Sequence, residues 1–436
     1  MKTPIRLLII TSSFALCGGA LSATNFVATD TGNWNDGATW DQGAATPGVG
    51  DRIEINGGVT VTLDSGAHTI ASIYDSGKSS TDHAAFIISG AGTSLTATAD
   101  SQLFYDSRLD FQVLGGATVN LQNLKMGNGN DIAINVTVTD SFFTAKFDDQ
   151  MRGSTKDGWG KVLLNGTTIA NATGRWGLNP TTANATMLLQ VDGKASLTMN
   201  NHALRAEASA AGSTAKIMIT NGGRITSNGE LQIYYNADAT NVIQIYGAGS
   251  TFSNGNNRIT IGNTEGELTG ASSGAIFGGY DELGNFVAAD SHSMYNDSEI
   301  IFNANTSLTF ILGDSNFSED KSGTAIIEGK FFKQVQGAIE LDFSNIEALD
   351  VGTYYVNLMT SYNQHFWNYS GADPDYDFAD HITIIKENAN VIYEGVVMSD
   401  DRTQMFVQIS VIPEAGTYAA IFGALALAFA IYRRRA

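Results

Sequence analysis

The acidic pair Asp148-Asp149 has the residue types that an enzyme acting on polysaccharides requires. A glycoside hydrolase holds two carboxylates on opposite sides of a bound sugar, and a lyase adds basic groups. The basic residues around this pair are Lys146, Arg152, Lys156 and Lys161. No second acidic cluster recurs at a spacing that would bring it to the same face. We therefore interpret the segment as a polar loop and predict no catalytic residues, with a polysaccharide lyase or glycoside hydrolase as the alternative.

A second acidic segment runs from Asp373 to Asp380, with carboxylates at nearly alternate positions. Oxygen ligands in this arrangement suit Ca²⁺, but the glycine of a calcium loop is absent and an alternating strand edge has the same spacing. The six histidines form no pair at metal-ligand spacing, and Cys17 is the one cysteine. We predict no cofactor and no metal site, and keep Ca²⁺ as the alternative.

Trp34 and Trp40 are six residues apart near the N-terminus. Their rings could stack on sugars or could close the open end of a hydrophobic core. We expect the second role. A glycan-binding adhesin using Trp34 or Tyr376 is the competing interpretation.

The elements that would carry these residues repeat along the chain. Alternating apolar residues surround a turn residue, and the turns follow one another at 25 to 29 residues, at Gly90, Gly115, Asp140, Gly166, Gly193, Gly222 and Gly247. An earlier copy has Gly57, and weaker copies have Asn305 and Gly329. Constant spacing with internal alternation is typical of a solenoid in which each unit makes one coil of short strands.

The sequence therefore predicts an all-β fold, a right-handed parallel β-helix, with a β-sandwich as the alternative. Glycines at the repeat corners would supply positive φ. We expect Ile87, Val113, Val191, Ile219 and Ile245 to point inward. The β-helix with its N-terminal cap would cover residues 24–320. A more aromatic segment, residues 321–411, would form a C-terminal β cap that protects the last coil from aggregation.

The N-terminus has the layout of a secretory signal peptide, residues 1–23. Lys2 and Arg6 precede an apolar run, and small residues lead to a cleavage site between Ala23 and Thr24. This layout predicts export through the Sec translocon.

The C-terminal segment, residues 412–436, combines a short motif, an apolar stretch and a basic cluster. Pro413, Glu414 and Ala415 precede the apolar residues 417–432, and Arg433, Arg434 and Arg435 follow. The apolar stretch predicts a transmembrane helix whose arginines stay on the cytoplasmic side. This order resembles the PEP-CTERM sorting signal, although Ala415 stands where the common motif has proline. The resemblance implies processing by an exosortase-like membrane peptidase and transfer to the surface or matrix.

Two segments of the middle also resemble known repeats. Residues 32–63 resemble the opening coil of autotransporter-like and PEP-CTERM β-helix proteins, and residues 243–263 resemble their repeat. The short C-terminal stretch differs from the large barrel that ends a true autotransporter.

Composition completes the expectation. Without the two end segments, the net charge of −20 loses five positive charges and becomes −25, or −24 if Glu414 leaves too. Such a surface repels nucleic acid and anionic lipid. We expect a structural or adhesive protein that passes through the inner membrane to the cell surface, outer membrane or extracellular matrix. Its partners there would be exopolysaccharide or surface glycans.

Overall fold

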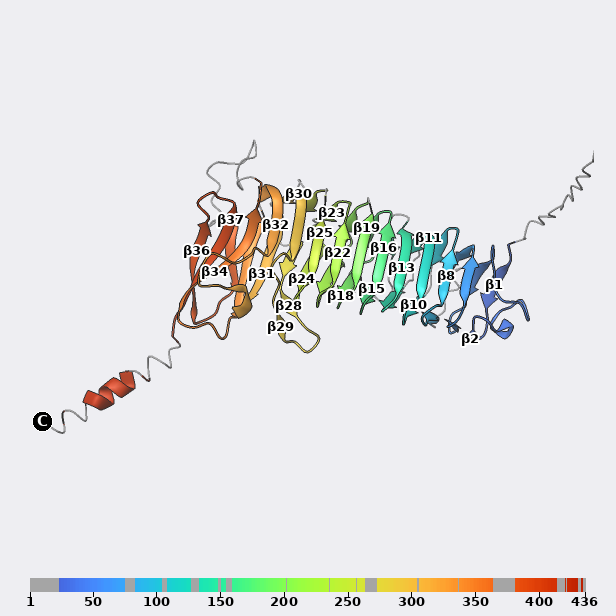
Figure 1. Cartoon of the computed structure of the whole chain (residues 1–436), viewed down its shortest axis with the longest axis horizontal. Helices are drawn as coiled ribbons and strands as arrows, with labels where there is room; N and C mark the ends of the chain where they lie inside the picture. Colours follow the sequence, from blue (N-terminus) through green and yellow to red (C-terminus); the bar gives the residue numbers. More distant parts are fainter. Residues whose placement is uncertain are drawn as a thin grey trace, which may run out of the picture.

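The computed structural model shows a long solenoid of parallel strands (Figure 1). It describes residues 23–74, 83–103, 108–126, 133–147, 150–153, 159–200, 202–234, 236–255, 257–262, 273–303, 306–335, 337–363, 381–413, 420, 422–429 and 433. Short strands alternate between three faces as the chain winds. The predicted parallel solenoid is confirmed, and the β-sandwich alternative is wrong.

The first face is a sheet of 13 strands, paired in parallel along its whole length. Its strands are β2 (Gly32–Asn33), β4 (Thr60–Leu63), β7 (Ala84–Ser89), β10 (Arg108–Leu114), β12 (Ala133–Thr139), β15 (Trp159–Asn165), β18 (Thr186–Asp192), β21 (Thr214–Thr220), β24 (Thr240–Tyr246), β27 (Gly274–Phe277), β31 (Ser307–Gly313), β33 (Ala338–Asn345) and β35 (Ile382–Lys386).

The second face follows each first-face strand after a tight corner. Its strands are β5 (Ala67–Ile70), β8 (Ser94–Ala97), β11 (Thr118–Met126), β13 (Phe142–Phe147), β16 (Ile169–Thr173), β19 (Ser196–Asn200), β22 (Arg224–Ser227), β25 (Thr251–Asn254), β30 (Met294–Phe302), β32 (Ile327–Val335) and β34 (Gly352–Ser361).

The third face closes each coil. Its strands are β1 (Asn25–Ala28), β3 (Arg52–Ile55), β6 (Ser72–Ile73), β9 (Ser101–Leu103), β14 (Gln150–Gly153), β17 (Trp176–Pro180), β20 (Leu204–Ala206), β23 (Leu231–Ile233) and β26 (Ile259–Ile261). The long strands β11 and β30 run from the second face into the third, where they pair with β9 and β26.

The core lies inside the coils and is built by alternation along each strand. Val113, Val191, Ile219 and Ile245 are buried on the first face, as predicted. The expectation for Ile87 was wrong, because Phe86 and Ile88 are both fully buried and Ile87 points outward between them. The apolar run around Ile87 fits either phase of a strand, and the pairing of Phe86 with Phe111 sets the phase.

Glycine is required at the corners between the first and second faces. Gly90, Gly115, Gly166, Gly193, Gly222 and Gly247 all have φ between 62° and 95°. Side chains with a Cβ rarely adopt this region, so these positions favour glycine.

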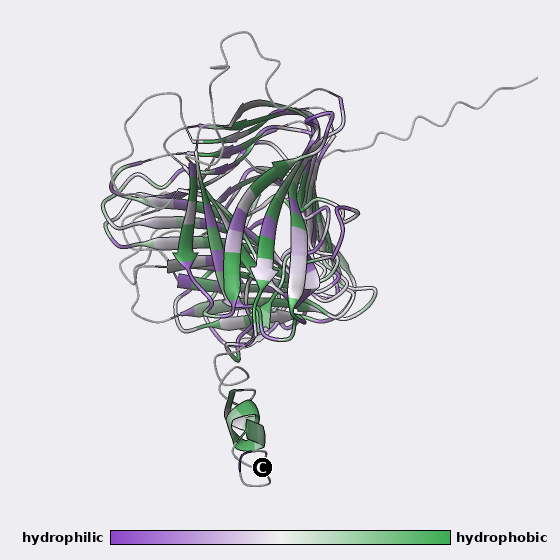
Figure 2. Cartoon of the chain, turned by 90° about the vertical axis from the view of Figure 1, so that its left-hand side faces the viewer, coloured by the Kyte–Doolittle hydropathy of each residue, from purple (hydrophilic) through white to green (hydrophobic). Residues whose placement is uncertain are grey.

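The two ends of the solenoid differ from its middle. At the N-terminal end, the short helix η1 (Gly37–Thr39) places Trp40 against Trp34, and both rings are buried. At the other end, β37 (Gln404–Val411) pairs antiparallel with β34 and with β36 (Val391–Met398). Figure 2 looks onto this second end and shows apolar and polar residues alternating along its strands.

Candidate functional site

The residues around the predicted acidic pair do not converge in the described part of the chain. Asp148, Asp149 and Lys156 lie outside the described residues. Lys146 is on the second face in β13, Arg152 is on the third in β14, and Lys161 is on the first in β15.

The predicted calcium segment, Asp373 to Asp380, also lies outside the described residues, together with Tyr376. Within the described ranges, no group of three or more His, Cys, Asp or Glu side chains could hold a metal ion.

The predicted processing sites fall at the edges of the described chain. Thr24 is anchored to the first coil, because its backbone N–H donates to Asp51 Oδ1 at 3.1 Å. Pro413 is described, whereas Glu414, Ala415, Arg434 and Arg435 are not.

Residues 422–429 are helical, as is Arg433, and the helix is coloured as apolar in Figure 2. Phe422, Leu425, Leu427 and Phe429 expose 57% to 76% of their surface. Among the helices that can be described, none is both long and apolar enough to cross a membrane.

Trp34 and Trp40 form a cap and offer no open ring face to a sugar. Trp34 is fully buried, stacks on Phe86 at 5.8 Å between ring centroids, and meets Trp40 edge-on at 5.2 Å. The Trp40 Nε1–H donates to the Trp34 carbonyl at 3.0 Å.

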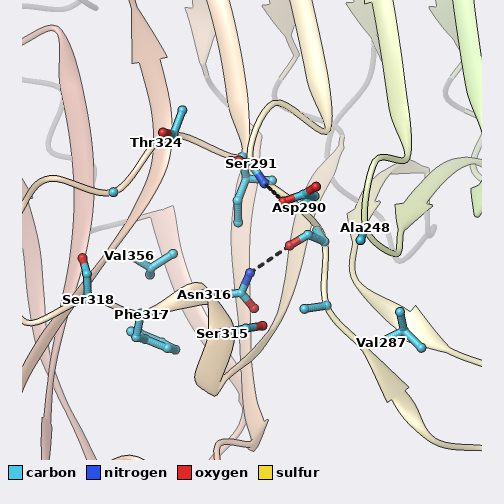
Figure 3. A pocket seen from close by; sticks show the side chains of 14 residues that line it. Ala248, Val287, Asp290, Ser291, Ser315, Asn316, Phe317, Ser318, Thr324 and Val356 are labelled. Carbon is cyan, nitrogen blue, oxygen red and sulfur yellow. Dashed lines mark hydrogen bonds between the residues drawn. The ribbon is translucent and has the colours of Figure 1, made fainter. Parts of the chain in front are cut away.

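A cavity of about 470 Å³ lies at the corner between the first and second faces, near the C-terminal end of the solenoid (Figure 3). Longer connections build it. Leu189 pairs with Ile217, 28 residues on, whereas Ile243 pairs with Ala275 and Ala275 with Leu308. The extra residues form the hairpin of β28 (Gly279–Tyr280) and β29 (Phe286–Val287), and the short helix η2 (Asp314–Asn316) with the segment after it.

Two polar side chains of the cavity hold its walls together. Asp290 accepts the backbone N–H of Gly249 and of Ser291, both at 2.9 Å. Asn316 donates to the carbonyl of Ala289 and accepts from the N–H of Gly313, both at 3.0 Å. These groups are committed to the fold, so they are not free to do chemistry.

Other groups of the cavity remain available to a ligand. The hydroxyls of Ser291, Ser315 and Thr324 have no hydrogen-bond partner within the described chain, and Phe317 and Val356 supply apolar surface. A small polar molecule with one apolar side matches this lining better than a charged one.

A second cluster lies on the outer surface of the second and third faces, where Tyr295 and Tyr362 stack with ring centroids 6.2 Å apart and planes 10° apart. The Tyr362 hydroxyl donates to Asp297 Oδ1 at 2.5 Å. Burial, and then the hydrogen bond to Asp297, raises the pKa of the Tyr362 phenol, so the hydroxyl keeps its proton at neutral pH.

The sequence reasoning missed this cluster, and it missed the cavity. Tyr295 and Tyr362 are far apart in the sequence and follow the point at which the repeat becomes irregular. An unusual density of tyrosine after residue 279 was the available indication.

Comparisons with known proteins leave the fold and these clusters as the basis for any functional argument. No protein-family model matches the chain, and neither a curated protein nor a solved structure is significantly similar to it.

Proposed function

We propose that the chain is an exported, non-enzymatic rod that serves as a structural or adhesive component of the cell surface or extracellular matrix. The observation that carries this proposal is a continuous parallel solenoid whose last coils are covered at both ends. Exposed sheet edges promote end-to-end association. Buried Trp34 and the antiparallel strands β34, β36 and β37 cover these edges, so the rod suits display as a single long surface.

The two sequence ends supply the direction of the proposal. A signal-peptide layout before Thr24 and a PEP-CTERM-like segment after Pro413 suit passage through the Sec translocon and processing by an exosortase-like peptidase. The exposed apolar side chains of residues 422–429 would hold the intermediate in the inner membrane until cleavage.

Mass spectrometry of the C-terminus in membrane, surface and medium fractions tests this proposal. We expect surface and medium protein to end near Glu414, and membrane protein to retain Arg435. A Pro413→Ala/Glu414→Ala double variant is the matched control and should keep its tail. An intact Arg435 in every fraction of the wild-type chain would reject sorting.

A further inference from the structure

The surface position of Tyr362 is set by bonds to two different coils. Its backbone N–H donates to the Gly329 carbonyl of β32 at 3.1 Å, and its hydroxyl reaches Asp297 of β30. The side chain therefore lies across β32. There its hydroxyl also approaches the Asn296 carbonyl at 3.3 Å and the Tyr295 hydroxyl at 3.4 Å.

This arrangement leaves an aromatic ring at the surface in a fixed orientation. Tyr362 remains 46% exposed although its hydroxyl is anchored to a carboxylate by a short, charge-assisted bond. Ordering a side chain on binding normally costs free energy, and an anchored ring has already lost that freedom. We infer that Tyr295, Tyr362 and Asp297 form a binding site for a neutral oligosaccharide.

The chemistry of the three side chains selects this ligand class. An aromatic face carries negative charge density and attracts the C–H groups on the flat side of a sugar ring. The second carboxylate oxygen of Asp297, Oδ2, has no hydrogen-bond partner in the described structure and can accept a sugar hydroxyl.

Charge excludes the acidic sugars. Asp297 and Glu328 both lie on this surface, where Glu328 is the pairing partner of Tyr295 and is bound to His292 at 3.0 Å. Lys330 lies two residues beyond Glu328 on the same strand. Since the whole chain carries −20, a uronic acid polymer would meet repulsion on approach.

The neighbouring coils extend the site along the rod. Tyr295 pairs with Ser253, and the Ser253 hydroxyl donates to the Thr226 hydroxyl at 3.2 Å in the next coil. A sugar chain leaving the tyrosine pair would therefore find hydroxyl partners on the second face. The inference deepens the proposed adhesive function and rests on it for its biological meaning.

Calorimetric titration of the purified full chain tests the site with four probes: cellohexaose, maltohexaose, chitohexaose and hexagalacturonate. We expect binding to at least one of the three neutral hexasaccharides. Tyr295→Ala and Tyr362→Ala should each weaken it by about tenfold. Tyr362→Phe keeps the ring and loses its anchor, so it should show a smaller loss.

Tyr280→Ala is the matched control, because Tyr280 is 40% exposed but belongs to the hairpin strand β28. Thermal unfolding of each variant identifies any that fails to fold, and the remaining variants then decide. Absence of binding to all three neutral probes, preference for hexagalacturonate, or equal affinity in the folded tyrosine variants would overturn the inference. The titration does not depend on where the protein resides, so its failure is separable from failure of the sorting experiment.

Discussion

Lys386 reaches across the last parallel pairing of the solenoid to Asp342, with its Nζ 2.8 Å from Oδ2. Asp342 is 1% exposed, whereas the lysine side chain is 54% exposed. The other carboxylate oxygen accepts the N–H and hydroxyl of Ser344. This pair ties β35 to β33, although the connection between these strands is much longer than in the regular coils.

Replacing the lysine should loosen the C-terminal end of the rod. In Lys386→Met, the buried carboxylate would keep Ser344 but lose its charged partner. Removing one member of a fully buried pair costs about 3–5 kcal/mol, and the exposure of Lys386 reduces our expectation to about 2 kcal/mol. Urea unfolding measures this loss. The exposed Lys194→Met variant is the control, and equal stability of the two variants would contradict the role of the pair.

The same pair predicts a pH dependence. Burial would raise the pKa of Asp342, but the bonds from Lys386 and Ser344 outweigh it and lower the pKa. The hydrogen bond to Asp342 raises the pKa of Lys386. The stabilisation is therefore complete between the unfolded-state values, about 3.9 and about 10.4. It is lost as pH falls through the lowered Asp342 pKa or rises through the raised Lys386 pKa.

The comparison of Asp342→Asn with wild type checks this dependence. The difference in unfolding free energy should be largest near neutral pH and shrink below about pH 4. A difference that stays constant from pH 7 to pH 3 would show that the carboxylate charge contributes nothing.

The N-terminal cap makes a prediction from two indole nitrogens. Trp40 Nε1 donates to the Trp34 carbonyl, whereas Trp34 Nε1 is buried without a hydrogen-bond partner in the described structure. Trp40→Phe and Trp34→Phe remove similar volume, but only the first breaks a hydrogen bond. We therefore expect Trp40→Phe to be less stable by about 1 kcal/mol. Paired thermal or urea unfolding curves measure the difference, and a larger loss in Trp34→Phe would argue against this account.

The regular half of the rod was predictable because one residue type controls each corner. Glycines such as Gly166 and Gly193 mark where the chain must turn with positive φ, and their spacing determines the coil length. The phase at Ile87 was not predictable, since apolar residues occupy neighbouring positions and pairing with the next coil decides. Beyond Gly262 the period itself fails. Contacts such as Tyr295–Tyr362 depend on connection lengths that no local pattern encodes.

The tightness of these corners can be tested with two glycines that share a backbone conformation. Gly247 has φ +90°, and an added Cβ would lie 2.8 Å from the backbone nitrogen of Asn221 in the preceding coil. Gly92 has φ +87° with no atom within 4 Å of the same position. Alanine at either site meets the positive-φ penalty of about 1 kcal/mol. Gly247→Ala must also displace a neighbouring backbone, so we expect it to lose about 2–4 kcal/mol in total.

Equilibrium unfolding in urea of both variants separates the steric from the conformational cost, because the conformational cost is common to them. Hydrogen exchange should show faster opening near Asn221 in Gly247→Ala and no such change in Gly92→Ala. If the two variants were equally stable, the coils would be able to move apart at the corner without loss. The close stacking of Gly247 on Asn221 would then contribute little to the stability of the rod.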